Sequence, residues 1–354
     1  MKTNKVDVSN CQTVAEVDAA LKKMKFYRLN SILGNANWGC MFYILIGPRA
    51  CGKSYAVMEQ FLKDWKKTGT QFYWIRLSKV SVDKLLKNKA DLLIEQEFKQ
   101  RFELDISVKG GQVFDHGRPM CKVLALSEMA KLKGLAFYSK DYDGIYNIAI
   151  DEWMREPGEK NTFPILYNLV GTLETILRRT QKNVRIFMMA NSLEEGSEIL
   201  ATGFDFIPEL PGRYYLKRKK AVIDLIPTTD EYKEYRKGSV ADILTPTASN
   251  FTNEIRRNKE LLWKGKRKKP TTIIKFSKDP DEWYTVWDGK IIAEYNKEKI
   301  NGLTIAMRPY IDALFDAEGR NAVIEQFDAR IFYFTDYKTQ IKFQNSLVSV
   351  RQTR

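Results

Sequence analysis

An eight-residue segment, Gly47–Ser54, constrains this chain more than any other part of its sequence. It reads Gly-Pro-Arg-Ala-Cys-Gly-Lys-Ser, which fits the pattern G-x-x-x-x-G-K-[ST] of phosphate-binding loops. An apolar run of strand length, Met41–Ile46, precedes it, and apolar residues at helical spacing follow it from Tyr55 to Trp65. A strand, a glycine-rich turn and a helix are the context in which this motif folds, so a chance turn between core elements is the weaker interpretation.

The motif predicts that the turn binds the phosphates of a nucleoside triphosphate. Backbone N–H groups of the loop and the N-terminus of the following helix together form an anion-binding site. Lys53 is placed to reach the β- and γ-phosphates, and the hydroxyl of Ser54 to coordinate Mg²⁺. We therefore expect ATP and Mg²⁺ as cofactors, and the expected nucleotide-binding residues are Gly47, Pro48, Arg49, Ala50, Cys51, Gly52, Lys53, Ser54 and Tyr55.

A second motif follows the apolar run Tyr146–Ile150, which leads directly into Asp151 and Glu152. Phosphoryl transfer from ATP needs a carboxylate that holds Mg²⁺ and a base that orients the attacking water. We therefore expect the strand of Asp151 to lie beside the strand of the phosphate-binding loop, with Asp151 as the metal ligand and Glu152 as the catalytic base. Two acidic residues that only cap a strand are the alternative interpretation.

Two further residues are predicted to belong to the catalytic site because they also end strands. Asn191 follows an apolar run, and a strand next to that of Asp151 would bring its amide to the attacking water or the γ-phosphate. Alternatively, Asn191 only caps a turn. Arg76, near the end of the predicted strand Gln71–Leu77, is expected to pair with Glu152 and hold this base away from water, unless it is an ordinary surface arginine.

A positive charge supplied from outside the site often accelerates hydrolysis of a nucleotide. Arg178 and Arg179, at the end of an amphipathic helix, are the catalytic candidates for this role toward a neighbouring subunit. Arg185, which opens the following strand, and Arg155 are weaker candidates. Cations at a helix C-terminus are favourable in any protein, so Arg178 and Arg179 also have a purely structural explanation.

Basic residues are concentrated in the middle of the chain. The formal net charge is +14, and residues 211–270 contain 16 Lys and Arg against seven Asp and Glu. Clusters such as Lys217–Lys220 and Lys266–Lys269 suit a polyanion like nucleic acid, although a solvated linker would have the same composition. In a chain expected to hydrolyse nucleotide we favour nucleic acid, and the candidate DNA contacts are Lys79, Lys131 and Lys133, with Lys140 nearby.

The remaining composition argues against several classes of protein. The longest apolar runs, such as Ile186–Ala190, are too short to span a membrane, and the first residues lack the apolar core of a secretory signal. The four cysteines have no CxxC spacing and His116 is the only histidine, which argues against a zinc site. Free cysteines in a reducing compartment are the simplest account.

The order of patterns predicts how the chain is divided. Alternating strands and helices over residues 37–211 indicate an α/β domain with a mostly parallel central sheet, the fold of P-loop nucleotide triphosphatases. Residues 1–36 are expected to be a lead-in and residues 212–250 a basic connector. Residues 251–354 contain strand patterns and an Asp288-Gly289 turn, which predict a small α+β domain.

Together these segments resemble the genome-packaging ATPases of small podophages, which belong to the P-loop ATPases with an added catalytic glutamate. The resemblance covers the N-terminal two-thirds of the chain well and persists weakly in Trp283–Tyr295 and Arg330–Phe343. The segments that carry it are Ile44–Ala56, Gln71–Arg76 with Lys79, Ile148–Glu156 and Met188–Ser192.

The resemblance implies a homomeric ring, of five subunits by analogy, on the portal of an empty procapsid in the host cytoplasm. There, ATP hydrolysis would drive double-stranded DNA inward. It also implies that Lys53 and Ser54 bind nucleotide and that Asp151 and Glu152 position the metal and the water. Arg76 would be the switch partner of Glu152, and Lys79 would grip DNA. Residues 178–185 differ from the family pattern, which leaves the choice of arginine finger open.

Larger packaging enzymes of tailed phages carry a nuclease domain in which clustered acids bind metal. Here the first predicted strand of the C-terminal domain, Thr271–Phe276, contains no carboxylate, so we expect a nuclease-like relic without cleavage activity. Such a domain would bind the portal, DNA or an RNA scaffold. Two other functions stay open: a helicase or AAA-type loader, and a basic structural protein that clamps DNA when it binds ATP.

Overall fold

The computed structural model of the chain divides into two compact units. The first comprises Met1–Glu194 with Pro208–Ile255, and the second Glu195–Ile207 with Arg256–Arg354. The residues that the structure describes are 26–33, 39–129, 144–154, 164–177, 183–191, 198–208, 210–238, 243, 261–263, 265, 270–276, 283–294, 310–313 and 315–352.

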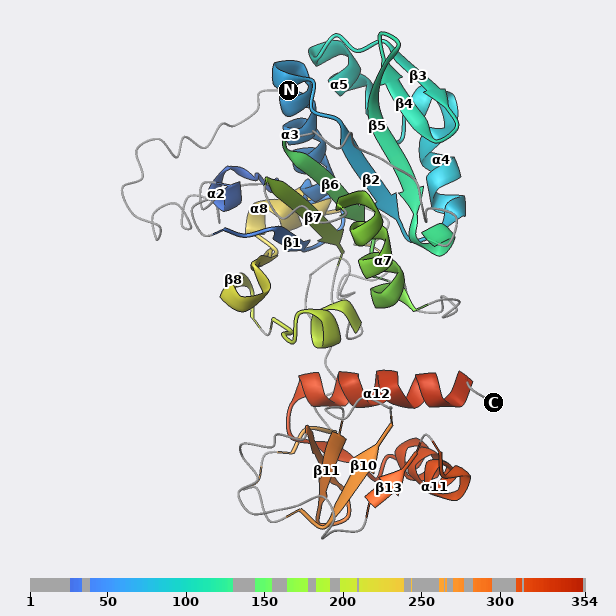
Figure 1. Cartoon of the computed structure of the whole chain (residues 1–354). Helices are drawn as coiled ribbons and strands as arrows, with labels where there is room; N and C mark the ends of the chain where they lie inside the picture. The colour runs from blue at the N-terminus through green and yellow to red at the C-terminus, as the bar shows by residue number, and fades with distance from the viewer. Residues whose placement is uncertain are drawn as a thin grey trace. The chain divides into compact units, whose positions relative to one another are not determined.

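The described strands of the first unit form one nine-stranded sheet, in the order β3-β4-β5-β2-β6-β7-β1-β9-β8 (Figure 1). The strands from β5 to β9 in this order are parallel, and β3, β4 and β8 are antiparallel additions at the two edges. This arrangement confirms the predicted α/β class with a mostly parallel central sheet. The strands are β1 (Phe42–Ile46), β2 (Phe72–Arg76), β3 (Ile106–Lys109), β4 (Gln112–Asp115), β5 (Arg118–Ala125), β6 (Tyr146–Asp151), β7 (Val184–Ala190), β8 (Gly212–Leu216) and β9 (Ala221–Leu225).

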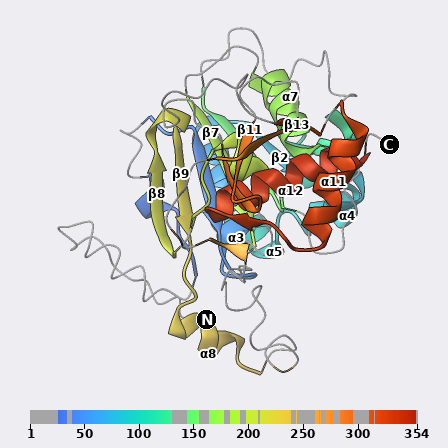
Figure 2. The ribbon, with the colours of Figure 1, turned by 90° about the horizontal axis from the view of Figure 1, so that it is seen from below.

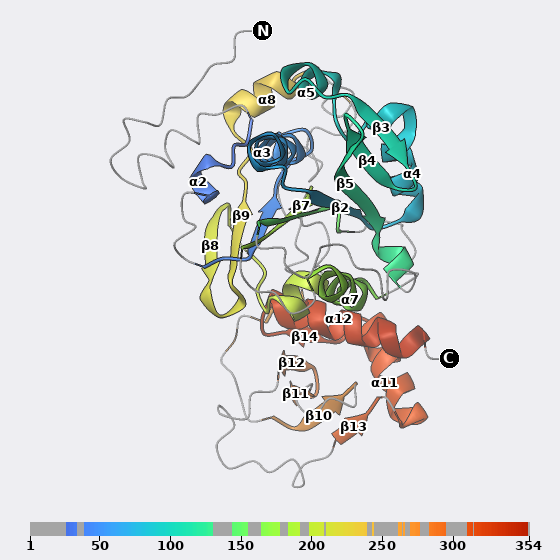
Figure 3. The same cartoon turned by 45° about the horizontal axis from the view of Figure 1, so that its top comes forward.

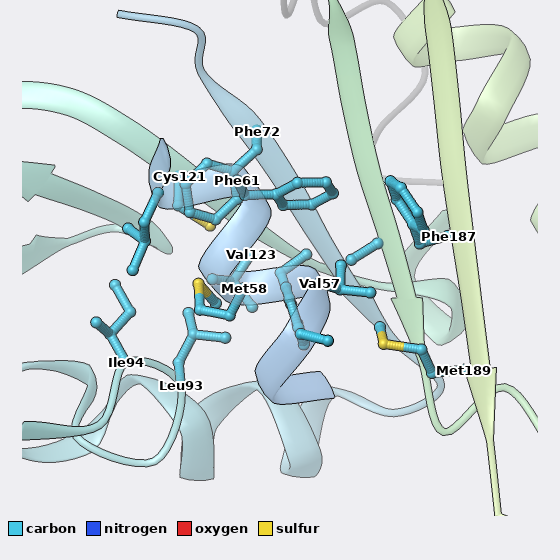
Figure 4. Close-up of a cluster of buried hydrophobic side chains, with 14 of the residues drawn as sticks. Val57, Met58, Phe61, Phe72, Leu93, Ile94, Cys121, Val123, Phe187 and Met189 are labelled. Carbon is cyan, nitrogen blue, oxygen red and sulfur yellow. The ribbon is translucent and has the colours of Figure 1, made fainter. Parts of the chain in front are cut away.

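Helices α3 (Lys53–Thr68) and α7 (Ile165–Leu177) lie on opposite faces of this sheet (Figure 3). Strands that are covered on both faces read as continuous apolar runs, and every residue of β6 is indeed buried. Figure 4 shows the packing of α3 on the sheet. The ring of Phe61 lies 5.2 Å from that of Phe72 and 5.6 Å from that of Phe187, measured between ring centroids.

The Lys- and Leu-rich stretch 82–102 has the composition of one long helix, but the structure contains two helices here. They are α4 (Lys79–Ala90) and α5 (Gln96–Arg101). Asn88 and Lys89 adopt left-handed φ angles of 51° and 57°, which interrupt the helical geometry. Asparagine tolerates this conformation better than most residues, and the break places Ile94 fully inside the core.

The segment 212–225 belongs to the main sheet, which corrects the expectation of a connector that begins at residue 212. β8 and β9 lie side by side as an antiparallel hairpin (Figure 2). β9 also pairs in parallel with β1, from Phe42 opposite Ala221 to Ile46 opposite Leu225. The basic run lies at the turn between the two strands, so its charge masked two strands of the sheet.

The described part of the second unit contains a five-stranded sheet in the order β13-β10-β11-β12-β14 with helices α11 and α12, which agrees with the predicted small α+β domain (Figure 1). Phe343 of α12 packs edge-on against the ring of Tyr284, with 5.1 Å between the centroids. Among the described residues, no helix is both long and apolar enough to cross a membrane. The elements are β10 (Thr272–Lys275), β11 (Trp283–Trp287), β12 (Ile291–Glu294), β13 (Tyr310–Asp312), α11 (Ala317–Asp328), β14 (Tyr333–Phe334) and α12 (Tyr337–Gln352).

Candidate active site

The candidate site lies at the edge of the main sheet where the parallel strands end. β1 ends at Ile46, β6 at Asp151 and β7 at Ala190, immediately before Asn191. One expectation about these strands is wrong, because β7 lies between β6 and β1 and the strand of Asp151 is therefore not beside that of the loop. Asn191, in contrast, does follow the strand next to that of Asp151, as predicted.

The phosphate-binding loop adopts the alternating backbone that an anion site needs. Ala50 and Gly52 have positive φ angles of 60° and 96°. Left-handed residues within such a turn gather successive backbone N–H groups into a concave surface. At its start, the N–H of Gly47 donates to the carbonyl of Asn191 at 2.7 Å, and a Cβ on Gly47 would lie only 2.8 Å from the Cβ of Ile226. Glycine is therefore required where the chain leaves the sheet.

Lys53, the first residue of α3, is buried within the loop itself. Its ammonium group donates to the carbonyl oxygens of Gly47 at 2.9 Å and Pro48 at 2.8 Å. A buried ammonium needs such partners, and in this arrangement the loop supplies them. Phosphate oxygens are stronger acceptors than carbonyls because they are charged, so the same ammonium can transfer to a bound triphosphate.

Ser54 and Asp151 come together although 97 residues separate them. The hydroxyl of Ser54 donates to a carboxylate oxygen of Asp151 at 3.1 Å. Hydroxyl and carboxylate oxygens are ligands that Mg²⁺ uses, usually together with phosphate oxygens of the substrate. The two residues therefore fit a magnesium site, and they are the pair that the sequence predicts for it.

Burial raises the pKa of Asp151, and the nearby charge of Glu152 adds to this effect. Arg76, Ser54 and Lys53 act in the opposite direction but do not outweigh the burial. A bound divalent cation favours the ionised carboxylate. Metal binding would therefore offset the desolvation of this group.

Arg76 connects the two acidic residues. Its guanidinium contacts a carboxylate oxygen of Asp151 at 2.8 Å and a carboxylate oxygen of Glu152. The side chain of Glu152 is 54% exposed, whereas that of Asp151 is only 6% exposed. Glu152 also has a φ of 53°, which is unusual for a residue other than glycine and costs free energy. The predicted pairing of Arg76 with Glu152 is present, and the contact to Asp151 is an addition to it.

Other predicted site residues have partners outside this arrangement. The hydroxyl of Tyr55 donates to Glu97 of α5 at 2.7 Å, and burial together with this acceptor raises the pKa of Tyr55 to about 12. The side chain of Tyr55 therefore joins two helices, and its role in nucleotide binding stays a prediction. Lys79 is the first residue of α4, and its ammonium contacts Asp83 one turn later.

Arg185 is placed at the opposite end of the sheet from the phosphate-binding loop, and its candidacy as an arginine finger stays a prediction. It opens β7, and its guanidinium contacts Asp64 of α3 and donates to the amide oxygen of Asn147 at 3.0 Å. These bonds join a helix to two strands within one subunit. The other predicted positions lie outside the described residues: Arg155, Arg178, Arg179, Lys131, Lys133 and Lys140.

Residues from two segments that the sequence analysis left outside the ATPase domain also reach the loop. The backbone N–H of Tyr27 donates to the carbonyl of Cys51 at 2.7 Å, and its hydroxyl donates to Asp224 of β9, also at 2.7 Å. The hydroxyl of Tyr232, on helix α8 (Asp230–Arg236), donates to the carbonyl of Arg49. No sequence motif marks either tyrosine, because each contact depends on chain pairing over a long distance.

Comparisons with known proteins find relatives among phage DNA packaging proteins. The DNA packaging protein of Bacillus phage B103 is 26% identical over 193 residues, which are 54% of this chain and 56% of that protein. The DNA packaging protein of Bacillus phage phi29 is 24% identical over 217 residues, 61% of each chain. The aligned region thus spans less than two-thirds of these relatives.

Two solved assemblies share the fold. The Phi-28 gp11 DNA packaging motor is 16% identical, with a TM-score of 0.64 over 92% of this chain and 97% of that chain. The bacteriophage Phi-29 viral genome packaging motor assembly is 18% identical, with a TM-score of 0.60 over 94% of this chain and 100% of that chain. A profile of the family described as Podovirus DNA encapsidation protein (Gp16) matches residues 21–321, most of the chain. The chain therefore belongs to the Podovirus DNA encapsidation protein (Gp16) family.

Proposed function

We propose that this chain is the ATPase of a motor that drives double-stranded DNA into a viral procapsid. One observation carries the proposal: Ser54, Asp151, Arg76 and Glu152 form a continuous chain of contacts beside a phosphate-binding loop. This set contains a metal-binding pair, a candidate base and a cation that holds the base. Membership of an encapsidation protein family supports DNA as the cargo.

In this mechanism the loop binds the triphosphate, and Lys53 exchanges the carbonyls of Gly47 and Pro48 for phosphate oxygens. Ser54 and Asp151 would hold Mg²⁺, which would supply positive charge to offset the negative charge on the phosphate oxygens. Glu152 orients the attacking water and accepts its proton.

Contact with Arg76 controls whether Glu152 can act on the attacking water. While its guanidinium holds Glu152, the carboxylate is occupied by that contact and does not orient the attacking water. Release of Glu152 by DNA or by a neighbouring subunit switches the base on. The exposed side chain of Glu152 and the strained backbone beneath it are consistent with a residue that moves.

The proposal extends to the assembly. Identical subunits form a ring, of five by analogy with the family, on the portal vertex in the host cytoplasm, and Arg178 or Arg179 completes the site of a neighbour. Lys79, Lys131 and Lys133 contact DNA phosphates. The C-terminal unit binds the portal, DNA or RNA without cutting DNA. Its acids Asp205 and Glu294 contact ammonium groups in the structure, which supports a role other than metal binding.

The test is ATP turnover of the wild type and Glu152→Gln, with and without duplex DNA and procapsids. We expect turnover that DNA or procapsids stimulate, and a loss of about 10²–10⁴-fold in kcat for the variant, the range of general-base catalysis. ATP binding should persist, because Glu152 is not a phosphate ligand. Glu325→Gln, an exposed acid on α11, is the matched control and should leave turnover unchanged.

DNA binding and strand separation, followed in the same reactions as ATP turnover, distinguish the rival functions. A passive ATP-gated clamp would bind DNA with little turnover, and its DNA binding would survive the loss of Glu152. A helicase would separate the strands of the duplex during turnover, whereas a packaging motor would leave them paired. Turnover that persists in Glu152→Gln would contradict the assignment of the base.

A further inference from the structure

Four carbonyl groups of the phosphate-binding loop are held by specific donors. Those of Gly47 and Pro48 accept from Lys53. Those of Arg49 and Cys51 accept from two tyrosines that lie far away in the sequence, Tyr232 and Tyr27. The lysine contacts belong to the motif, but the tyrosine contacts come from outside it and need an explanation of their own.

The direction of a carbonyl fixes the direction of the next N–H group. A trans peptide unit is planar, with its C=O and N–H on opposite sides, and the described residues contain no cis peptide. A donor that holds the carbonyl of Arg49 therefore turns the N–H of Ala50 to the other side. In the same way, the bond to the carbonyl of Cys51 turns the N–H of Gly52 away from Tyr27.

The residues that follow these carbonyls are the ones in left-handed conformation, Ala50 and Gly52. For alanine this conformation is unfavourable, so it persists only where the surroundings enforce it. The hydroxyl of Tyr232 acts on the peptide directly before Ala50. This side chain is only 2% exposed, which limits its freedom to leave the carbonyl.

Tyr27 is itself anchored. Its hydroxyl donates to a carboxylate oxygen of Asp224 at 2.7 Å, and Arg213 donates twice to that carboxylate, at 2.8 Å each. Burial and the neighbouring carboxylate raise the pKa of Tyr27 well above its usual value, so the hydroxyl remains a donor. The anchored residue lies against the loop: a Cβ on Gly52 would be 3.5 Å from the backbone nitrogen of Tyr27.

We propose that Tyr232 and Tyr27 are positioning residues that preorganise the empty loop for the phosphates of ATP by holding the carbonyls of Arg49 and Cys51 outward. This inference rests on the proposed nucleotide site and adds two residues to it. An empty loop that already has its binding conformation loses less free energy on ordering when ATP binds. A loop without these bonds populates that conformation for only part of the time, which weakens the apparent affinity in proportion.

Tyr232→Phe tests the inference because it removes one hydroxyl and keeps the ring. We expect the Kd for the non-hydrolysable analogue AMP-PNP with Mg²⁺, measured by calorimetry, to rise about threefold to tenfold, the effect of one hydrogen bond. The KM for ATP should rise to a similar extent with kcat within about twofold, because ground state and transition state lose the same contact. Without nucleotide, amide hydrogen exchange in residues 47–54 should be faster than in the wild type.

Tyr214→Phe is the matched control. Its hydroxyl bonds to the backbone of Leu210, a residue outside the phosphate-binding loop, so binding and exchange should equal those of the wild type. Tyr27→Phe should give a smaller rise in Kd than Tyr232→Phe, because its donor to Cys51 is a backbone N–H that the substitution keeps.

The outcomes are distinguishable. If Tyr232→Phe binds AMP-PNP as tightly as the wild type, the inference fails and the proposed function is untouched. A lower melting temperature with unchanged Kd would also overturn it, because the hydroxyl would then have a structural role only. If the wild type itself binds no AMP-PNP, the nucleotide site fails and the inference fails with it.

Discussion

Asp151 and Asp115 form an instructive comparison, because both are aspartates that are only 4% exposed and both end strands of the same sheet. Their environments shift the pKa values of the two carboxyl groups in opposite directions. Burial alone would raise the pKa of Asp115, but hydrogen bonds from Trp65, His116 and Lys66 outweigh it, and the pKa lies below its usual value. The pKa of Asp151 is instead raised, first by burial.

The number and type of donors explain the difference. Asp115 accepts from the indole N–H of Trp65 at 2.9 Å, the ammonium of Lys66 at 3.2 Å and the backbone N–H of Asp105 at 3.0 Å, and it contacts His116 at 2.8 Å. These bonds join α3 to the β3–β4 hairpin. A buried carboxylate with this many donors is stabilised in its ionised form and supports the fold.

Asp151 has fewer compensating partners and an unfavourable neighbour. It accepts from Ser54 and Arg76, while the negative charge of Glu152 lies close by. The fold thus holds a carboxylate that is not fully compensated at the end of β6. We infer that this free energy is recovered when Mg²⁺ binds, which is how a site can be destabilising for the fold and still be useful.

The largest effect is expected for Asp115→Asn. The amide cannot accept from all of these donors and carries no charge to match Lys66. We expect the free energy of unfolding in urea at neutral pH to fall by about 2–3 kcal/mol, the range for hydrogen bonds to a charged group. Asp83→Asn, an exposed carboxylate, is the control and should change it by less than about 0.5 kcal/mol. If Asp115→Asn lowered the free energy of unfolding only slightly, the proposed contrast between Asp115 and Asp151 would be wrong.

Asp151→Asn should change the free energy of unfolding by less than Asp115→Asn does, and in the opposite direction. The substitution removes the desolvated charge, and Arg76 keeps its contact with Glu152. We expect the nucleotide-free variant to be as stable as the wild type or more stable by about 1 kcal/mol, a typical trade-off at a functional site. Adding ATP with Mg²⁺ should stabilise the wild type against urea and the variant much less. A large loss of stability without ligand would contradict this account of Asp151.

The two aspartates should also differ in how they make folding stability depend on pH, because their pKa shifts have opposite signs. The pKa of Asp115 is lower in the folded chain, so its contribution is present above the usual value of 3.8 and is lost as the pH falls through the folded pKa. The pKa of Asp151 is higher in the folded chain, so stability decreases as the pH rises from 3.8 through the folded pKa.

Urea unfolding of both variants at a series of pH values tests these signs. The loss in Asp115→Asn and the gain in Asp151→Asn should both shrink as the pH is lowered, because a protonated aspartate resembles asparagine. At the acid end, each variant should lie within about 0.5 kcal/mol of the wild type. A gain in Asp151→Asn that grows as the pH falls would show that the sign assigned to its shift is wrong.

The two aspartates also show what sequence can predict. Asp151 follows an apolar run and precedes a second acid, so its position at the end of a strand and its meeting with the phosphate-binding loop could be predicted. Asp115 precedes His116-Gly117 and reads as an ordinary turn residue, since its donors come from residues 65, 66 and 105. Burial of a polar side chain depends on distant partners that no local pattern specifies.

This dependence on distant partners also explains why the predicted sheet lacked β9 and had the wrong strand order. β9 reads Ala-Val-Ile-Asp-Leu, and Asp224 interrupts an apolar run that would otherwise have indicated a buried strand. Arg213 and Tyr27 compensate that charge only in the folded chain. The insertion of β7 between β6 and β1 was equally hidden, because strand order is a property of long-range pairing. Local motifs predicted the residues of the site, and tertiary pairing decided their neighbours.

The smallest loss of stability is expected for His116→Ala. This substitution tests how many hydrogen-bond donors are needed to stabilise the Asp115 carboxylate. The His116 side chain is 62% exposed, so its contact with the carboxylate competes with water, and the donors from Trp65, Lys66 and Asp105 remain. We expect the free energy of unfolding in urea to fall by no more than about 0.5 kcal/mol, the usual size for an exposed pair, with no change in ATP turnover. A loss as large as that of Asp115→Asn would mean that one exposed contact stabilises the carboxylate. The contrast with Asp151 would then reflect a single partner, and not the number of buried donors.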